Sequence, residues 1–310
     1  MTRAPDRTVA YIGLGLMGGP MSGRLVSRGW SVRGFDIAAD RMAAAAKQGV
    51  ELFDTAQKAA QGAACVILNL PTTQAVETVM FGPQGLSPHL RPPQTVVDFS
   101  TIRVAQGRAF IARQHRESGC HWIDAPVSGG PAAAATGTLT VMAGATDDGR
   151  AAVESLMADV AQRFTVLGPP GSGLVAKMLN QLMVGCLHAT VAELANVAEK
   201  AGIQADLVPQ ALAGGHADGI LFQQIYPRMR ARDFAPRGYV RQLLKDLDMV
   251  IAFSRSLQAA TPMTQQAQAL YQALADQGHS ELDTSAVIKI YEDANGRPSA
   301  MAQSLSTSPR

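Results

Sequence analysis

A single lysine interrupts an apolar segment in the second half of the chain. The segment GLVAKMLNQLMVG covers residues 173–185, and Lys177 is its fifth residue. On an α-helix, Lys177 shares a stripe with Gln181 one turn later and with His188 three turns later, and Asn180 lies at the edge of that stripe. An unpaired ammonium on such a helix would cost several kcal/mol of desolvation free energy. We therefore expect Lys177 to have a partner or a chemical role.

Proton transfer is the chemistry that a buried lysine can perform. An alcohol that loses a hydride must also lose its hydroxyl proton, and the reverse reaction needs a proton donor. A lysine can take either role when burial or a neighbouring cation lowers the pKa of its amine, which is ordinarily about 10.4. The alternative is a surface lysine whose amine extends into solvent. We expect His188 to be a core or interface histidine outside the site.

A glycine-rich loop near the N-terminus indicates a dinucleotide site. The segment VAYIGLGLMGGPM has the spacing GxGxxG, with a strand pattern before it and a helix pattern after it. The first glycine permits a tight turn, the second lets a pyrophosphate approach the backbone, and the third permits close helix packing. The alternative is a plain glycine turn. The expected cofactor contacts are Gly13, Leu14, Gly15, Leu16, Met17 and Gly18.

An acid follows the glycines at the distance that ribose recognition requires. Asp36 ends the second strand pattern, about twenty residues beyond the loop, where its carboxylate can accept bonds from the adenosine ribose hydroxyls. The same charge would repel a 2′-phosphate, so NAD is favoured over NADP. Arg33 and Arg41 are close enough in the sequence to keep NADP open.

Composition excludes several partner classes. The 310 residues are 47% hydrophobic and 17% charged, with a formal net charge of +2, so no strong field would draw the chain to nucleic acid or an anionic membrane. Cys65, Cys120 and Cys186 are widely spaced in apolar surroundings, which favours reduced core thiols over disulfides or a metal site. Without a signal-peptide pattern or a long membrane-span pattern, we expect a cytoplasmic protein.

The pattern of elements predicts an α/β domain followed by an all-α domain. Short β-rich runs alternate with helical stretches over residues 8–170, which predicts a doubly wound Rossmann sheet. A long helix from about Leu174 to Lys200, capped by Gly202, then joins this domain to a helical domain, giving 171–293 as the second domain. Its further helices are expected near 206–213, 219–230, 236–257, 263–277 and 283–292, and the tails 1–7 and 294–310 are expected to be disordered.

Four segments in unbroken order carry a family resemblance. They are GLGLMG, DAPVSGG at 124–130, GSGLVAKMLNQ at 171–181 and LLKDL at 243–247. Together they resemble the β-hydroxyacid dehydrogenase family, which includes 3-hydroxyisobutyrate dehydrogenase and 2-hydroxy-3-oxopropionate (tartronate semialdehyde) reductase. The likeness runs from about Thr8 to Tyr291. It implies hydride transfer between NAD(P) and a short 3-hydroxy carboxylate or its semialdehyde.

The resemblance implies a role for each candidate in the substrate site. Ser128, Gly129 and Gly130 would bind the substrate carboxylate, which suits a hydroxyl and exposed backbone amides. Lys177 would be the general acid or base. Asn180 and Gln181 would hold the substrate hydroxyl or orient Lys177, and this Asn-Gln pair is closer to the reductase than to members with two asparagines.

The resemblance also implies further cofactor contacts. The loop Leu70, Pro71 and Thr72 would cover the adenosine and nicotinamide ribose. Thr101 follows a parallel strand, at the edge where ligands of α/β sheets bind, and would lie beside the nicotinamide. Lys245 would reach the nicotinamide end of the cofactor, and the neighbouring acid would be mainly structural.

The substrate stays open among related acids. Within the same superfamily, an L-threonate-type sugar-acid dehydrogenase is the alternative, and a different class is a non-catalytic NAD-binding interaction module. His216 and Asp218 depart from the small residues common in the family, which bears on substrate size. Lys177 counts against imine reductases. Phosphogluconate dehydrogenases have a larger helical domain and a basic phosphate site, and the sequence shows neither. The long helix and apolar helical domain favour a homodimer or homotetramer.

Overall fold

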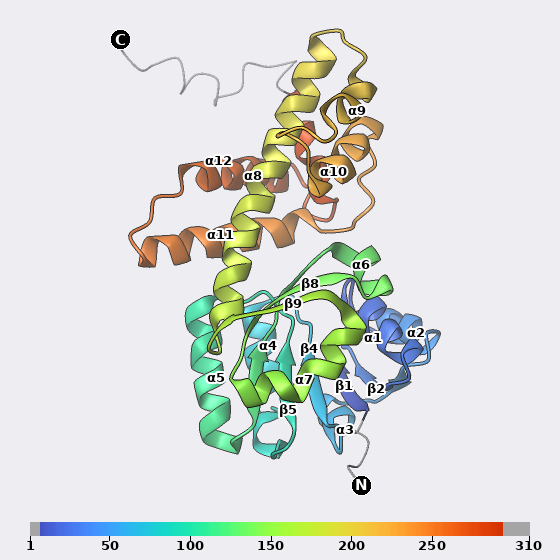
Figure 1. Ribbon diagram of the computed structural model, residues 1–310, viewed down its shortest axis with the longest axis vertical. Coiled ribbons are helices and arrows are strands. Elements are labelled where there is room, and N and C mark those ends of the chain that lie inside the picture. The colour runs from blue at the N-terminus through green and yellow to red at the C-terminus, as the bar shows by residue number, and fades with distance from the viewer. Residues whose placement is uncertain (1–6, 294–310) are drawn as a thin grey trace. The chain divides into compact units, whose positions relative to one another are not determined.

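The computed structural model describes residues 7–293 and divides the chain into two compact units, Met1–Met178 and Leu179–Arg310 (Figure 1). The boundary falls inside helix α8 (Ser172–Lys200), which begins in the first unit and ends in the second. The predicted tails, 1–7 and 294–310, lie outside the described residues except for Arg7. The carbonyl of Arg7 accepts a hydrogen bond of 2.9 Å from the Ser31 amide.

The first unit contains the doubly wound sheet that the sequence predicts. Its strands follow the order β3-β2-β1-β4-β5-β6-β8-β7, with β9 paired to β8, and the run from β3 to β6 is parallel. Such parallel pairing requires crossover helices. The strands are β1 (Thr8–Ile12), β2 (Ser31–Phe35), β3 (Glu51–Leu52), β4 (Cys65–Leu68), β5 (Thr95–Asp98), β6 (His121–Asp124), β7 (Val127–Ser128), β8 (Leu139–Gly144) and β9 (Ala161–Gly168).

The far end of the sheet departs from the parallel pattern. β8 pairs antiparallel with β6 and with β7, and β9 then pairs parallel with β8. Only Ala125 and Pro126 separate β6 from β7, which is too short for a crossover. The chain therefore remains at the carboxyl end of β6, and the 127–130 segment is held there rather than in an open glycine turn.

Helices cover the sheet of the first unit (Figure 1). The helical stretches of the sequence pattern correspond to α1, α2, α5 and α7, whereas α3, α4 and α6 were not predicted. For α4 a start signal was present, because the Thr72 hydroxyl accepts a bond of 3.1 Å from the Ala75 amide. The helices are α1 (Gly18–Ser27), α2 (Ala39–Ala46), α3 (Ala56–Ala60), α4 (Thr73–Phe81), the 3₁₀ turn η1 (Ser87–His89), α5 (Val104–Ser118), α6 (Gly130–Thr136) and α7 (Asp147–Val160).

Both faces of the sheet are buried, as a parallel sheet requires. On one face Tyr11, Ile67 and Ile123 belong to a core cluster that includes residues of α1 and α7. On the other face Trp122 stacks on Phe81 of α4, with 6.3 Å between ring centroids. The sheet is therefore a rigid platform for the loops at its edge.

The described part of the second unit is helical, as predicted. Besides α8 it contains η2 (Ala205–Leu207), α9 (Val208–Leu212), α10 (Ile220–Ala231), α11 (Val240–Ser256), α12 (Pro262–Asp276), η3 (Thr284–Ile288) and α13 (Lys289–Asp293). His188 is buried in this unit, where its Nδ1 lies 2.9 Å from the Val184 carbonyl oxygen and its Nε2 lies 3.0 Å from the Thr284 hydroxyl. Burial lowers the pKa of His188, which favours a neutral structural imidazole.

Helix α8 mixes polar and apolar residues on both its buried and its exposed sides. Lys177, Gln181 and His188 are buried, whereas Leu179 and Met183 are more than half exposed. By length and mean hydropathy α8 could span a membrane, but half of its most apolar stretch is buried, and its buried residues include Lys177, Gln181 and His188. These properties fit the core helix of a soluble protein better than a membrane span.

Two buried carboxyl groups lie side by side where β5 and β6 end. Asp98 and Asp124 are register partners in the parallel pair, and both are almost fully buried. Burial raises the pKa of Asp98 to about 7 and that of Asp124 to about 6, and the charge of Asp124 further raises the pKa of Asp98. One Asp98 oxygen, Oδ2, has no hydrogen-bond partner among residues 7–293. Asp98 is therefore the member of the pair that more readily holds a proton.

This burial predicts a stabilising substitution. Between about pH 4 and pH 7 folded Asp98 binds more protons than unfolded Asp98, so its presence makes the free energy of unfolding fall as pH rises through 7. Asp98→Asn removes that dependence and should raise the free energy of unfolding at pH 8 by about 1–3 kcal/mol, with a smaller gain at pH 5. Urea denaturation followed by tryptophan fluorescence reports on this unit, because both tryptophans, Trp30 and Trp122, lie in it. A variant less stable than the parent at pH 8 would contradict the prediction.

Candidate active site

The glycine loop is shaped by the packing of the chain on itself. Gly13 has a φ of +97°, and a Cβ added there would lie 2.3 Å from the Asn69 carbonyl oxygen. A Cβ on Gly18 would lie 1.9 Å from the carbonyl oxygen of Gly13. Both positions therefore exclude any side chain, because Gly13 packs on the backbone after β4 and Gly18 packs on the loop itself.

Gly15 is different, and the difference fits a bound cofactor. A Cβ added at Gly15 would meet only the end of the Arg41 side chain, with 3.5 Å to Nη1. The fold thus leaves room at Gly15, and the approach of a ligand is a reason for a glycine there. No side chain caps the N-terminus of the ten-residue helix α1, and its first turn has no acid. The loop and this helix end suit a pyrophosphate.

Asp36, the residue predicted to meet the adenosine ribose, anchors the glycine loop. Its Oδ2 accepts a bond of 2.7 Å from the Leu14 amide, and its Oδ1 accepts one of 2.8 Å from the Ala38 amide. Arg41 Nη1 lies 3.9 Å from Oδ2. Each carboxylate oxygen has two lone pairs, so contact with ribose hydroxyls remains compatible with these bonds. The anchoring role was not visible in the sequence.

Two loops at the carboxyl edge of the sheet are tied together. The Leu70 amide donates a bond of 2.9 Å to the Ser100 hydroxyl, and the Arg103 amide donates one of 3.1 Å to the Thr73 hydroxyl. These bonds join the segment of Leu70, Pro71 and Thr72 to that of Thr101, the two predicted cofactor loops. Pro71 and Thr72 are exposed, and Leu70 and Thr101 are half-buried.

The structure brings Lys177 to the predicted substrate segment. Lys177 is buried, and its Nζ donates a bond of 2.8 Å to the carbonyl oxygen of Val127. Ser128 is the next residue, and Gly129 and Gly130 follow it with φ of +131° and +71°. Within the first unit, the candidate acid or base and the candidate carboxylate site are therefore neighbours.

A chain of side-chain contacts links the candidates of the second unit. Asn180 Nδ2 donates to Gln181 Oε1 at 2.8 Å, and Gln181 Nε2 donates to Asp246 Oδ2 at 2.5 Å. Lys245 Nζ lies 3.1 Å from the other carboxylate oxygen, Oδ1. Asp246 is buried, and it connects the Asn-Gln pair of α8 with the lysine of α11. This central position of Asp246 is a finding of the structure.

Asp218, one of the residues that depart from the family pattern, holds the segment around it through hydrogen bonds. Asp218 accepts bonds from the Gly214 amide (2.8 Å), the Gly219 amide (2.8 Å) and Gln223 Nε2 (2.7 Å). These bonds, rather than burial, lower the pKa of Asp218. The aspartate therefore fixes the turn before α10.

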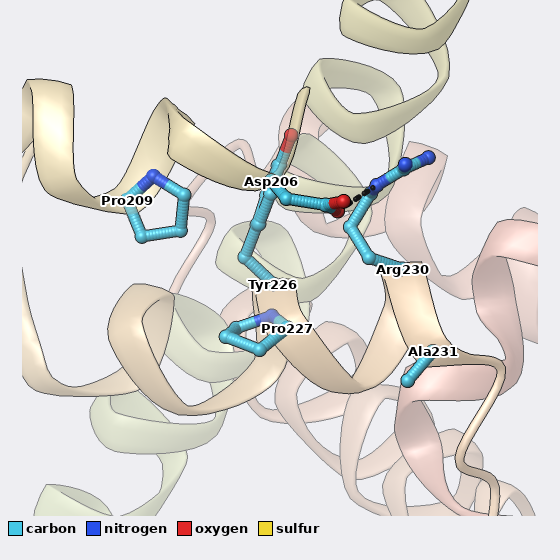
Figure 2. A pocket seen from close by; sticks show the side chains of 6 residues that line it. All are labelled: Asp206, Pro209, Tyr226, Pro227, Arg230 and Ala231. Atoms are coloured by element: carbon cyan, nitrogen blue, oxygen red, sulfur yellow. Dashed lines mark hydrogen bonds and ion pairs between the residues drawn. The ribbon is translucent and has the colours of Figure 1, made fainter. Parts of the chain in front are cut away.

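The helical unit also has a hollow of about 390 Å³ next to α10 (Figure 2). Figure 2 shows Asp206 bonded to Arg230, which lies on the same helix as Tyr226, Pro227 and Ala231. The Tyr226 hydroxyl donates to the Ala205 carbonyl at 2.8 Å, and Arg230 is paired with Asp206 and Glu199. The lining includes none of the predicted site residues, and its polar groups already have partners.

Comparison with known protein families covers nearly the whole chain. Residues 8–168 match the model of the NAD binding domain of 6-phosphogluconate dehydrogenase. Residues 171–291 match the model of the NAD-binding domain of NADP-dependent 3-hydroxyisobutyrate dehydrogenase.

Individual relatives agree with these matches. The chain is 31% identical to an NAD-dependent L-serine dehydrogenase of Pseudomonas aeruginosa, over 94% of this chain and 100% of that one. It is 32% identical to a 2-hydroxy-3-oxopropionate reductase of Escherichia coli, over 92% and 97%. A solved structure of 3-hydroxyisobutyrate dehydrogenase from Mycobacterium tuberculosis with L-serine matches with a TM-score of 0.81 and 31% identity, over 92% and 98%.

The glycine loop, the α/β unit followed by a helical unit, and these full-length relatives all indicate the same family. The chain belongs to the β-hydroxyacid dehydrogenase family, whose members are NAD(P)-dependent oxidoreductases that act on CH–OH donors.

Proposed function

We propose that this enzyme interconverts a short 3-hydroxy carboxylate and its semialdehyde, with Lys177 as general acid or base. The observation that carries the proposal is the 2.8 Å bond from Lys177 Nζ to the Val127 carbonyl, directly before Ser128. An amine held there can reach the C3 oxygen of a small acid whose carboxylate lies on residues 128–130.

Each residue has a defined task in this proposal. Ser128, with the amides of Gly129 and Gly130, binds the substrate carboxylate. Lys177 takes the hydroxyl proton during oxidation and returns it during reduction. When bound, the nicotinamide supplies the hydride acceptor or donor. Asn180 holds the substrate hydroxyl, and Gln181 orients Asn180 through their 2.8 Å bond.

The cofactor contacts complete the proposal. Residues 13–18 take the pyrophosphate, and Leu70, Pro71, Thr72, Thr101 and Lys245 contact the remainder. Asp36 favours NAD, since its carboxylate is the group that a 2′-phosphate would meet, whereas Arg41 near Gly15 leaves NADP usable.

We infer that the substrate is built on the 3-hydroxypropanoate skeleton with a small C2 substituent. L-serine, glycerate and 3-hydroxyisobutyrate share that skeleton and differ only at C2, and the Asn-Gln pair favours a C2 hydroxyl. A panel of these acids and L-threonate, with NAD and NADP and absorbance read at 340 nm, tests the proposal. A protein that binds NADH but turns over none of them would instead be a non-catalytic module.

We place the enzyme in the cytoplasm, since the free cysteines suit a reducing compartment.

The first prediction of the proposed function concerns Lys177. Lys177→Ala should lower kcat by about a hundredfold or more and leave NADH binding intact, because a lost general acid or base affects the proton and not the cofactor. Steady-state kinetics and NADH fluorescence titration measure the two quantities. Lys47→Ala removes an exposed lysine and is the matched control. Unchanged turnover in Lys177→Ala would remove the proposed mechanism.

The second prediction concerns cofactor choice. Asp36→Asn should raise the KM for NAD several-fold and narrow the preference for NAD over NADP, because the amide no longer repels a phosphate and bonds the Leu14 amide less well. Asp40→Asn, the same charge change at an exposed position of α2, should alter neither value. A parent enzyme that already prefers NADP would refute this assignment.

The third prediction concerns assembly. We propose a homodimer or homotetramer, supported by the exposed apolar residues Leu179, Met183 and Leu187 along α8. Met183→Glu should shift the sedimentation coefficient toward the monomer, whereas Met263→Glu, at a similarly exposed methionine of α12, should not. A monomeric parent would dismiss the proposal.

A further inference from the structure

The start of α8 is held by one buried carboxylate. Asp124 Oδ1 accepts a bond of 2.6 Å from the Gly171 amide, and Oδ2 accepts one of 2.8 Å from the Leu174 amide. Gly171 immediately precedes α8, and Leu174 is in its first turn. Asp124 therefore caps α8 from a strand that lies far away in the sequence.

The helix start also packs directly on backbone. A Cβ added at Gly173 would lie 2.4 Å from the Asp124 carbonyl oxygen and 2.6 Å from that of Met142. The first turn of α8 thus rests on the main chain of β6 and β8, where flexible side chains cannot absorb a shift. Any movement of this turn passes along the helix to Lys177.

The charge of Asp124 suits this cap. The carboxylate faces the positive end of a 29-residue helix and accepts backbone amides, both of which favour its anionic form against burial. With its pKa at about 6, Asp124 is mostly ionised at neutral pH. Asp98 beside it is more readily protonated, which limits the repulsion between the two groups.

We propose that Asp124 is a positioning residue: its carboxylate fixes the first turn of α8 and so holds the Lys177 amine against the 127–130 segment. Leu174, which it binds, lies less than one helical turn before Lys177. Asp124 lies three residues before Val127, whose carbonyl accepts the Lys177 bond. The bonds of Asp124 to the start of α8 and of Lys177 to Val127 thus connect α8 to both β6 and β7. This inference rests on the proposed role of Lys177.

A double-mutant cycle tests whether Asp124 acts through Lys177. Asp124→Asn keeps the shape but presents an amide NH₂ to backbone donors, so kcat should fall about tenfold or more, while the KM for NAD changes less than about twofold. In the Lys177→Ala background the same substitution should change kcat by less than about twofold, because the group it positions is gone. The assay uses the acid from the panel that is turned over fastest.

The outcomes separate the inference from the proposed function. An equal loss of kcat from Asp124→Asn in both backgrounds would overturn the positioning role. If Lys177→Ala itself leaves turnover unchanged, the proposed function fails first. Asp159→Asn is the matched control: Asp159 is also buried in the first unit, but it bonds Arg28 and Trp30, so its loss should lower stability and leave kcat unchanged.

If Asp124→Asn folds poorly, hydrogen exchange of a second variant tests the positioning role without measuring turnover. Asp124→Ser keeps one acceptor oxygen, and hydrogen exchange of the peptides covering 171–178 should accelerate in it about tenfold or more, while exchange in α1 stays the same. Equal acceleration in α1, or none at 171–178, would show that Asp124 does not fix this turn.

Discussion

The bond between a buried aspartate and the first amides of α8 is the constraint on which the rest of the site depends. Asp124 ends a central strand, and α8 begins on it. From that fixed start the helix carries Lys177 within two turns, so the two bonds to Asp124 set the origin for the candidate acid or base. A helix that starts on backbone and a carboxylate has little freedom to slide.

The same region shows how the fold tolerates two neighbouring carboxyl groups that are buried away from solvent. Asp98 and Asp124 are neighbours on parallel strands, and full ionisation of both would add like-charge repulsion to the cost of burial. Only Asp124 has a helix end to bind, so the two groups differ in surroundings although their positions in the strands are equivalent. The difference favours the charged form of Asp124 and the protonated form of Asp98.

Much of the fold could be predicted from the sequence, because the hydrophobic periodicity of a long element indicates whether it is a helix or a strand. The Rossmann sheet, the long helix and the helical unit all follow from such patterns. Short elements such as α3 and α6 have too few residues to show a period. The antiparallel end of the sheet depends on how two residues turn after β6, and no pattern reports that.

For the candidate site, the sequence could nominate residues but not their contacts. Lys177 stood out because an apolar helix should exclude it, and Asp36 because of its distance from the glycines. The roles of Ser100, Asp124 and Asp246 depend on partners that are distant in the sequence, so single-sequence reasoning could not supply them.

The double attachment of Asp36 has a consequence for redesign of this enzyme. The carboxylate that we propose meets the ribose also accepts a bond from the Leu14 amide, so in this proposal one side chain governs both cofactor selectivity and loop geometry. Replacing Asp36 with a residue that tolerates a 2′-phosphate would also remove the acceptor of the Leu14 amide. Retargeting toward a phosphorylated dinucleotide would therefore need a second, compensating substitution that restores an acceptor for that amide.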